Sequence, residues 1–248
     1  MKVTTYKTKK VVIGDSLFKI FDENLPKLNE KDVVVITSKI VSICQKRVVK
    51  NDGVIAKEEL IKQEADLLMP PEYIRFGVRL TIKNNLLIGS AGIDQSNGND
   101  YFILWPKDLR KTINEIWKYL RNKHQVKYLG VIISDSHSSL FKRGAVGFGI
   151  SWCGFKPLRN YVGKPDIFGR LLQTEQQNVV DGIAAAAVLE MGEGNEQTPI
   201  AVVNELRGIE FVNRIPNRKE IEETTITLDS DVYSGILNSI TWLKGGGN

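Results

Sequence analysis

The sequence predicts a mixed α/β fold, because short apolar runs typical of buried strands alternate with segments of helical periodicity. Residues 33–36 (VVVI) and 128–134 (YLGVIIS) have the character of buried strands, and residues 179–191, with four consecutive alanines, that of a tightly packed helix. No internal repeat or low-complexity segment interrupts the alternation. The chain of 248 residues is 42% hydrophobic, which is enough apolar material for one large core or two small ones.

The other elements are predicted from the same periodicities. Residues 56–69 have helical spacing and end at two prolines, whereas residues 78–88 alternate apolar and polar side chains, as a half-buried strand does. Residues 106–123 open with a proline in the first helical turn, and residues 199–203 return to a strand. From Arg218 onward we expect a polar strand, then a short helix and a frayed glycine tail.

No clear linker divides the chain, so we expect a single domain over residues 1–248, either one compact body or two interleaved lobes. No apolar run approaches the roughly 20 residues that cross a bilayer. The N-terminus also lacks the apolar stretch of a signal peptide. We therefore expect a cytoplasmic protein without a membrane span.

The composition restricts the chemistry of any metal site. Two cysteines, far apart in sequence, and two histidines leave few soft ligands, so a zinc site of the cysteine or histidine type is nearly excluded. A bound metal would need carboxylate and hydroxyl ligands, which suit Mg²⁺ or Mn²⁺. The net charge of +5 is spread along the chain rather than gathered in a basic stripe, which favours a small anionic ligand over a nucleic acid.

Two loops that follow predicted strands carry acidic residues. Residues 89–97 (GSAGIDQSN) combine small residues, which allow close backbone approach to a ligand, with the polar side chains of Asp94 and Asn97. A solvated turn is the alternative interpretation of this loop. Residues 130–136 end in Asp135 and Ser136 at the carboxyl edge of a strand, where α/β proteins usually bind ligands. A simple cap or turn is the alternative there.

Two further loops are weaker candidates. Glu193 follows the alanine-rich helix at its C-terminus, where the helix dipole disfavours an acid, so a bound cation would remove the conflict. A plain glycine helix stop is the alternative. Lys142 and Arg143 precede a glycine-rich stretch that does not match a Walker A motif, and surface solvation is their commoner role. The acidic loops, the mild positive charge and the lack of soft ligands together indicate a nucleotide site with a divalent metal.

The order of five motifs resembles that of the coenzyme F420-0:L-glutamate ligase family, the γ-glutamyl ligases that add glutamate to a deazaflavin cofactor. The resemblance covers residues 32–203 approximately. Its motifs are TSKIVS at 37–42, GIDQSN at 92–97, VIISDS at 131–136, GKPDIFGR at 163–170 and MGEG at 191–194.

The resemblance implies a homodimer with interleaved lobes and a nucleotide cleft that contains two divalent ions. The family's metal ligands fall on Asp94, Asp135, Ser136 and Glu193. The positions that hold the nucleotide in the family fall on Ser38, Lys39, Asn97, Met191, Gly192, Gly194 and Asn195. As metal-holding carboxylates, Asp94 and Asp135 are also expected to be catalytic residues. An arginine, for which we select Arg143 over Arg159 and Arg170, would bind substrate carboxylates bidentately.

The sequence departs from the family pattern around these positions. Where the family usually reads Ser-Lys-Ala-Glu-Gly-Arg, residues 42–47 read SICQKR, so a nucleotide-facing lysine and a glutamate are missing. Ser138 and Ser139 replace a usual Gly-Arg pair after the metal-binding aspartate. The pattern suggests the same chemistry on an altered acceptor or nucleotide.

We therefore expect a GTP- or ATP-dependent γ-glutamyl ligase that uses Mg²⁺ or Mn²⁺. It would join L-glutamate to a carboxylate-ended cofactor, coenzyme F420-0 by default, through an acyl phosphate. One alternative is the same chemistry on a folate-type pterin, as in folate polyglutamylation, or on another acid. A second alternative is a catalytically silent protein that only binds the nucleotide or cofactor. The expected partners are these small molecules and a second copy of the chain, with no nucleic acid and no membrane.

Overall fold

The structure, a computed structural model, describes residues 1–247. The chain forms two compact units. Unit 1 comprises Met1–Gln45 and Pro106–Thr224, and unit 2 comprises Lys46–Trp105 and the residues from Thr225 onward. The chain therefore passes from one unit to the other three times, and the end of the sequence returns to the unit that its middle part builds.

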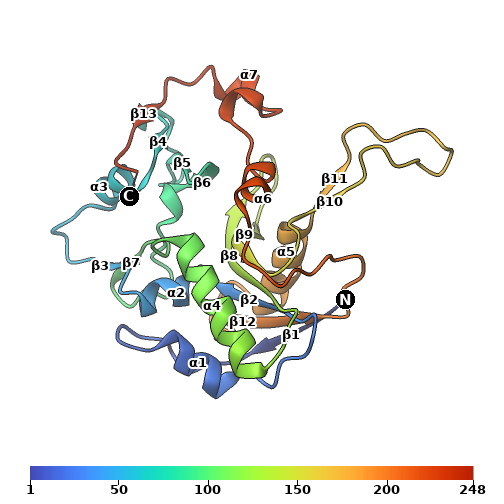
Figure 1. The fold of residues 1–248 in the computed structure, drawn as a ribbon. Coiled ribbons are helices and arrows are strands. Elements are labelled where there is room, and N and C mark those ends of the chain that lie inside the picture. Colours follow the sequence, from blue (N-terminus) through green and yellow to red (C-terminus); the bar gives the residue numbers. More distant parts are fainter. Residues whose placement is uncertain (248) are drawn as a thin grey trace. The chain divides into compact units, whose positions relative to one another are not determined.

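A five-stranded sheet forms the centre of unit 1 (Figure 1). Its order is β1 (Lys2–Tyr6), β12 (Ile200–Asn204), β2 (Val33–Thr37), β8 (Gly130–Ser138) and β9 (Ala145–Cys153). Only β2 and β8 are parallel neighbours. The apolar run in β2 is completely buried, which confirms the predicted strand at residues 33–36. Such a continuous apolar run is typical of a strand that is covered on both faces.

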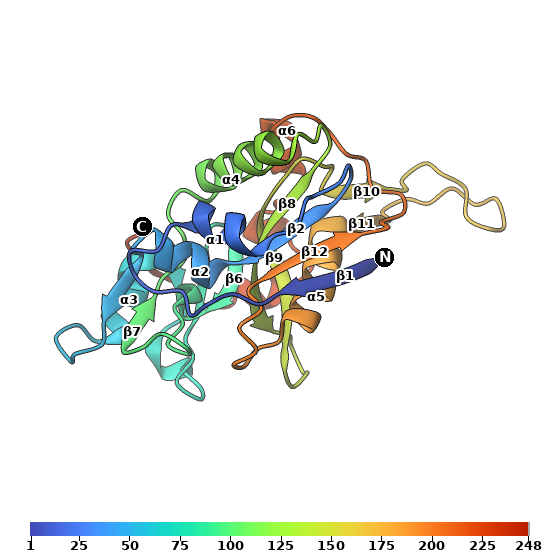
Figure 2. The same cartoon turned by 90° about the horizontal axis from the view of Figure 1, so that it is seen from below.

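Helices cover both faces of this sheet (Figure 2). α1 (Leu17–Asn24), α2 (Ser38–Cys44) and α4 (Leu109–His124) share one apolar cluster with Val34 and Ile36 of β2. α5 (Val179–Met191) shares the other cluster with Val33 and Val35. Alternate side chains of β2 therefore enter different cores. α5 has the predicted bounds, and α4 begins at Leu109, three residues later than the proline that opens the predicted helix.

Two further parts of unit 1 lie outside the sheet. β10 (Leu158–Asn160) and β11 (Gln176–Asn178) pair antiparallel and carry the loop of residues 161–175 away from the rest of the unit, as an arm (Figure 1). α6 (Arg218–Glu223) begins with a capping box of Asn217 and Glu220. Glu220 also pairs with Arg214 and Lys156, and these cations lower the pKa of its carboxyl to about 2.

Unit 2 contains a four-stranded sheet and a two-stranded ribbon. The sheet order is β13 (Leu243–Lys244), β4 (Leu67–Leu68), β5 (Leu80–Lys83) and β6 (Leu86–Gly89), and the ribbon pairs β3 (Val48–Lys50) with β7 (Tyr101–Ile103). The helical elements are α3 (Lys57–Glu64), α7 (Ser234–Leu237) and the 3₁₀ turns η1 (Pro71–Tyr73), η2 (Ser90–Gly92) and η3 (Leu228–Ser230). A small core joins α3, β4, η2 and β7.

Buried ion pairs hold unit 2 together beside this core. Glu64, 4% exposed, accepts hydrogen bonds from Arg47 at 2.7 Å and from Lys83. Burial lowers the pKa of the Lys83 ammonium. Because a buried charge without its partner is costly, these pairs fix the position of α3 against β5.

Three predictions of secondary structure were wrong. The helix predicted over residues 56–69 ends at Glu64, and Leu67–Leu68 form β4. The strand predicted over residues 78–88 is a hairpin, because Asn84 and Asn85 adopt φ of 50° and 60°, the left-handed pair that a two-residue hairpin turn requires.

The third wrong prediction concerns the C-terminal region. The helix α6 comes first and the strand β13 last, the reverse of the predicted order. The tail does not fray over residues 245–247, because their amides donate to the carbonyls of Lys62 in α3 and of Ala65 and Asp66 just after it. Asn248, the last residue of the predicted tail, lies outside the described residues. Among residues 1–247, no helix has the length and apolar character needed to cross a membrane.

Candidate functional site

The parallel pairing of β2 with β8 brings several predicted site residues to one edge of the sheet. Thr37 lies opposite Ser134, so Ser38 and Lys39 leave β2 beside the point where Asp135 follows in β8. The β8–β9 ladder also shifts register between Ile133 and Ser134, and such irregularities often re-aim side chains near active sites. The carboxyl edge of parallel strands is the usual ligand-binding edge in α/β proteins.

Ser136 contacts Glu193, although the two residues are 57 positions apart. The Ser136 hydroxyl donates to Oε2 of Glu193 at 3.2 Å, and the Ser136 amide donates to Oδ1 of Asp135 at 2.9 Å. Gly192, with φ of 77°, ends α5 and turns the chain toward this contact. Asp135 and Ser136 are half-buried, whereas Glu193 is exposed. Carboxylate and hydroxyl oxygens are the hard ligands that Mg²⁺ and Mn²⁺ prefer, so the chemical types of these three residues fit the predicted metal.

The loop after α5 is held by its own side chains. The Met191 side chain is 5% exposed and belongs to the core, so any contact of Met191 with a ligand would come from its backbone. Its carbonyl already accepts a hydrogen bond from the Thr198 hydroxyl at 2.6 Å. The Gly194 amide donates to Glu196 at 2.8 Å, and Asn195 is exposed. The nucleotide-binding roles of these residues stay predictions.

The fourth predicted metal ligand, Asp94, belongs to unit 2 and follows a strained turn. Ser90, Ala91 and Gly92 adopt successive left-handed φ values of 53°, 54° and 72°. Left-handed non-glycine residues cost about 1–2 kcal/mol each, and such strain is concentrated at functional sites. The Ala91 amide is held by the hydroxyl of the buried Thr81 at 2.9 Å.

The carboxylate of Asp94 is oriented by Ser96. The amide of Ser96 donates to Oδ1 at 2.7 Å, and its hydroxyl donates to Oδ2 at 3.0 Å. The Asp94 backbone is paired in both directions with Ile103, at 2.8 and 3.0 Å. Asn97 lies exposed in the same turn. The roles of Ser96 and Thr81 were missed from the sequence; the Asp-x-Ser spacing is a typical turn signal for Ser96, whereas no pattern marks Thr81.

The four predicted metal ligands are divided between the two units, with Asp94 in unit 2 and the other three in unit 1. Among residues 1–247 no group of three or more His, Cys, Asp or Glu side chains is gathered as a metal-binding cluster. In unit 1 the predicted set contains two acids, Asp135 and Glu193, and the hydroxyl of Ser136. The assignment of the four ligands therefore stays a prediction.

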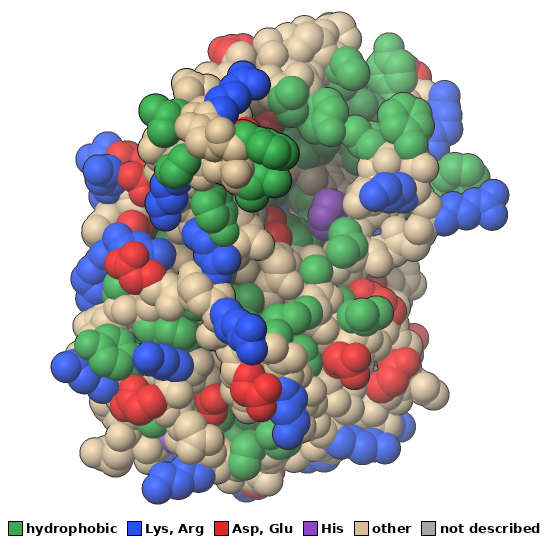
Figure 3. Space-filling model, turned by 90° about the vertical axis from the view of Figure 1, so that its right-hand side faces the viewer, with side chains coloured by type: hydrophobic (Ala, Val, Ile, Leu, Met, Phe, Trp, Pro, Cys, Tyr) green, Lys and Arg blue, Asp and Glu red, His purple; other side chains and the backbone are tan. Residues whose placement is uncertain are grey.

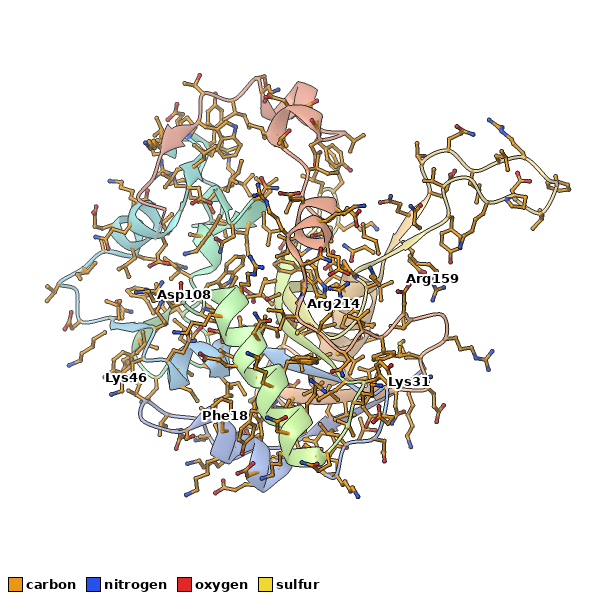
Figure 4. The ribbon with its side chains drawn as sticks, in the orientation of Figure 1. Phe18, Lys31, Lys46, Asp108, Arg159 and Arg214 are labelled. Carbon is orange, nitrogen blue, oxygen red and sulfur yellow. The ribbon has the colours of Figure 1, made fainter. Side chains whose placement is uncertain are left out.

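The arginines considered for carboxylate binding have different surroundings. Arg143 is exposed in the turn between β8 and β9, on the hairpin that also carries Asp135. Arg159, labelled in Figure 4, is committed to its own unit: its guanidinium donates to the carbonyls of Arg207 at 2.6 Å and Gly208 at 3.0 Å. Arg143 is the better candidate of these two, and its catalytic role stays a prediction.

The departures at residues 43–46 have local structural roles. Ile43 is 9% exposed, as suits an apolar residue in place of lysine. Gln45 accepts from the Lys107 amide and donates to the Thr112 hydroxyl, both at 2.8 Å, and so ties the end of α2 to the start of α4. Lys46 adopts a left-handed φ of 59°.

Charge is distributed without a single-sign region on the face that Figure 3 shows, where acidic and basic side chains are interleaved. This mixture agrees with the mild net charge of +5. A nucleic-acid-binding surface usually has a continuous basic stripe. The face drawn in Figure 3 has no such stripe.

The fold defines a mixed α/β protein whose central sheet carries carboxylate and hydroxyl side chains beside two parallel strands. The family model described as F420-0:Gamma-glutamyl ligase matches residues 5–205, and the chain belongs to this family. A coenzyme F420:L-glutamate ligase of Methanococcus maripaludis (strain C7) is 30% identical over 190 residues, 71% of this chain and 76% of the relative. Those of Methanosarcina mazei and Archaeoglobus fulgidus are each 29% identical, over 80% and 78% of this chain and 82% of each relative.

Proposed function

We propose that the protein is a nucleotide- and metal-dependent γ-glutamyl ligase whose acceptor is coenzyme F420-0. The observation that carries the proposal is the contact of Ser136 with Glu193 beside the β2–β8 edge, in a chain that belongs to the F420-0:γ-glutamyl ligase family. That contact joins two motifs from distant parts of the sequence. Composition alone left both of them open to interpretation as ordinary turns.

The proposed reaction has two steps. The γ-phosphoryl group of the nucleotide passes to a carboxylate oxygen of the acceptor and gives an acyl phosphate and a nucleoside diphosphate. The amine of L-glutamate then attacks the acyl carbon, an amide bond forms, and inorganic phosphate leaves with loss of a proton from nitrogen. Divalent ions would supply charge stabilisation for the phosphoryl oxygens. The residues proposed to hold them are Asp135, Ser136 and Glu193 in unit 1 and Asp94 in unit 2.

The remaining predicted residues bind and orient the substrates. Ser38 and Lys39 follow β2 at the same edge as Asp135, which suits contacts with phosphate oxygens. Asn97 and residues 191–195 complete the proposed nucleotide contacts. Arg143 binds a carboxylate of glutamate or of the acceptor, since a guanidinium pairs with carboxylates bidentately.

The dependence of the reaction on a nucleotide and on a divalent metal can be measured directly. We expect phosphate release when the purified protein is given F420-0, L-glutamate, Mn²⁺ and either GTP or ATP, and the ratio of the two rates identifies the preferred nucleotide. Folate in place of F420-0 tests the pterin alternative. Turnover by Asp135→Asn at the rate of the unaltered protein would contradict the metal assignment. Tight nucleotide binding without turnover on either acceptor would favour the silent binding protein.

We also propose that the protein is a homodimer. The arm of unit 1 exposes Ile167 and Phe168, which are 92% and 89% exposed, and exposed apolar residues on an extended hairpin are typical of a contact with another copy. Light scattering is expected to give twice the chain mass of 27.9 kDa. The substitution Phe168→Ser is expected to shift the equilibrium toward the monomer, and a monomeric unaltered protein would contradict the proposal.

A further inference from the structure

The last residues of the chain complete the sheet of unit 2. We call residues 243–247 the C-terminal strap; they lie outside the match to the family model, which ends at residue 205. Leu243 and Lys244 form β13 and pair antiparallel with Leu68 and Leu67 of β4 (Figure 1). An element from the far end of the sequence is therefore the edge strand of this sheet.

The strap also closes the C-terminal end of α3. The backbone amides of its three glycines donate to carbonyl oxygens at distances of 2.8–2.9 Å, and the acceptors are Lys62, Ala65 and Asp66. A helix end leaves its last carbonyls without helical partners, and the amides of the strap satisfy one of them, that of Lys62, within α3.

Glycine is required at this contact because two backbones approach closely. A Cβ atom at Gly246 would lie 2.5 Å from the carbonyl oxygen of Gln63, and one at Gly245 would overlap the carbonyl of Ala65. Gly235, in α7 of the same C-terminal segment, has nothing within 4 Å of such an atom and an ordinary φ. Substitution of Gly246 therefore tests the close contact, and the same substitution at Gly235 is its control.

The sheet connects the strap to the loop that carries Asp94. Leu243 pairs with Leu68, and Leu68 pairs with Thr81 of β5. The Thr81 hydroxyl accepts from the amide of Ala91 at 2.9 Å, inside the left-handed turn that leads to Asp94. Two strand pairings and one hydrogen bond thus connect the strap to the strained turn.

The core of unit 2 provides a second connection. Leu60 and Ile61 of α3, the helix whose end the strap closes, pack in one apolar cluster with Ala91 and Ile93. Movement of α3 would therefore disturb the residues on both sides of Gly92. Both connections end at the turn before Asp94.

We propose that the C-terminal strap is a positioning element that holds the Asp94 loop in its strained conformation. A strained turn keeps its conformation only while the residues packed around it hold it there. The strap supports those residues on the side of β4 and α3. The proposal rests on the proposed function only in taking Asp94 as a metal ligand.

Hydrogen exchange tests the proposal without any metal. In Gly246→Ala, amides of residues 86–97 are expected to exchange about tenfold faster, while those of β2 and β8 in unit 1 stay unchanged. Gly235→Ala is expected to match the unaltered protein. A chain that ends at Trp242 removes the strap outright and is expected to give the larger effect. Release of residues 240–247 with unchanged exchange in 86–97 would overturn the proposal.

A double-mutant cycle tests whether the effect passes through Asp94. Gly246→Ala is expected to weaken Mn²⁺ binding about tenfold, as removal of a supporting contact commonly does, and to change nothing further in Asp94→Asn. An equal loss in both backgrounds would overturn the link to Asp94. If the unaltered protein binds no Mn²⁺, the proposed metal site is wrong, and the exchange experiment alone decides the role of the strap.

Discussion

Lys46 is a non-glycine residue with a left-handed backbone conformation. Its φ is 59°, in the region that glycine adopts most readily. A non-glycine residue in this region costs about 1–2 kcal/mol, because Cβ crowds the following carbonyl oxygen. Lys46 is exposed (Figure 4), so its side chain gains little packing to offset that cost.

Lys46→Gly is therefore expected to stabilise the protein. The gain should be about 0.5–1 kcal/mol, since the entropy that glycine loses on folding cancels part of the relieved strain. Lys50→Gly, in β3, is the matched control, because Lys50 has ordinary strand geometry and the same change should lower stability there. Both are measured by denaturant unfolding. Equal destabilisation by the two substitutions would contradict the strain at Lys46.

Glu193 and Glu190 offer a comparison of two nearby carboxylates at one helix end. Glu190 is exposed in the last turn of α5, whereas Glu193 contacts the hydroxyl of Ser136. Glu193→Gln is expected to weaken Mn²⁺ binding at least about tenfold, and Glu190→Gln to leave it unchanged. Isothermal titration with Mn²⁺ measures both. The same affinity in the two variants would remove Glu193 from the proposed ligand set.

At the scale of elements, the end of α4 contains a pH-sensitive contact. His124 is the last residue of this helix, and its Nδ1 accepts a hydrogen bond from the Leu28 amide at 3.2 Å, which only a neutral ring can do. Burial lowers the pKa of His124 below its ordinary value of 6.5, and the nearby Lys123 and Lys27 lower it further, against the opposite effect of Asp22.

Stability is therefore expected to fall as the solution becomes acidic. The unfolded chain takes up the His124 proton near pH 6.5, before the folded chain does, so the contribution is complete above about pH 6.5 and declines below it. Denaturant unfolding between about pH 5 and pH 8 measures this dependence. His124→Gln keeps a hydrogen-bond acceptor that does not titrate and should flatten this part of the profile. An unchanged profile in His124→Gln would exclude the contact as its source.

The helices and strands also differ in how well the local sequence predicts them. The strand at residues 33–36 was predictable from a continuous run of β-branched apolar residues, and α5 from a thirteen-residue segment of mostly apolar side chains. β4 and β13 have two residues each, too few for any periodicity, and they exist because their neighbours pair with them. The turn at Asn84 was readable in principle, since paired asparagines favour left-handed φ.

At the scale of the whole molecule, each unit has its own core, and the chain passes between them without a linker signal. The passage after Gln45 follows a helix end tied to α4, so no Gly- or Pro-rich stretch marks it. The meeting of Ser136 and Glu193 was expected only through the order of family motifs. No local sequence pattern predicts a contact between residues so far apart, because the contact depends on how the end of α5 packs against the edge of β8.

The most direct test of the proposed activity is the mass of the acceptor. F420-0 is incubated with the protein, L-glutamate, GTP and Mn²⁺, and the product is analysed by mass spectrometry, with Glu193→Gln as the control. We predict that F420-0 gains at least one glutamyl residue with the unaltered protein and gains it far more slowly with Glu193→Gln. An acceptor of unchanged mass, under conditions where the nucleotide and Mn²⁺ are bound, would contradict the assignment of this chain as a γ-glutamyl ligase of F420-0.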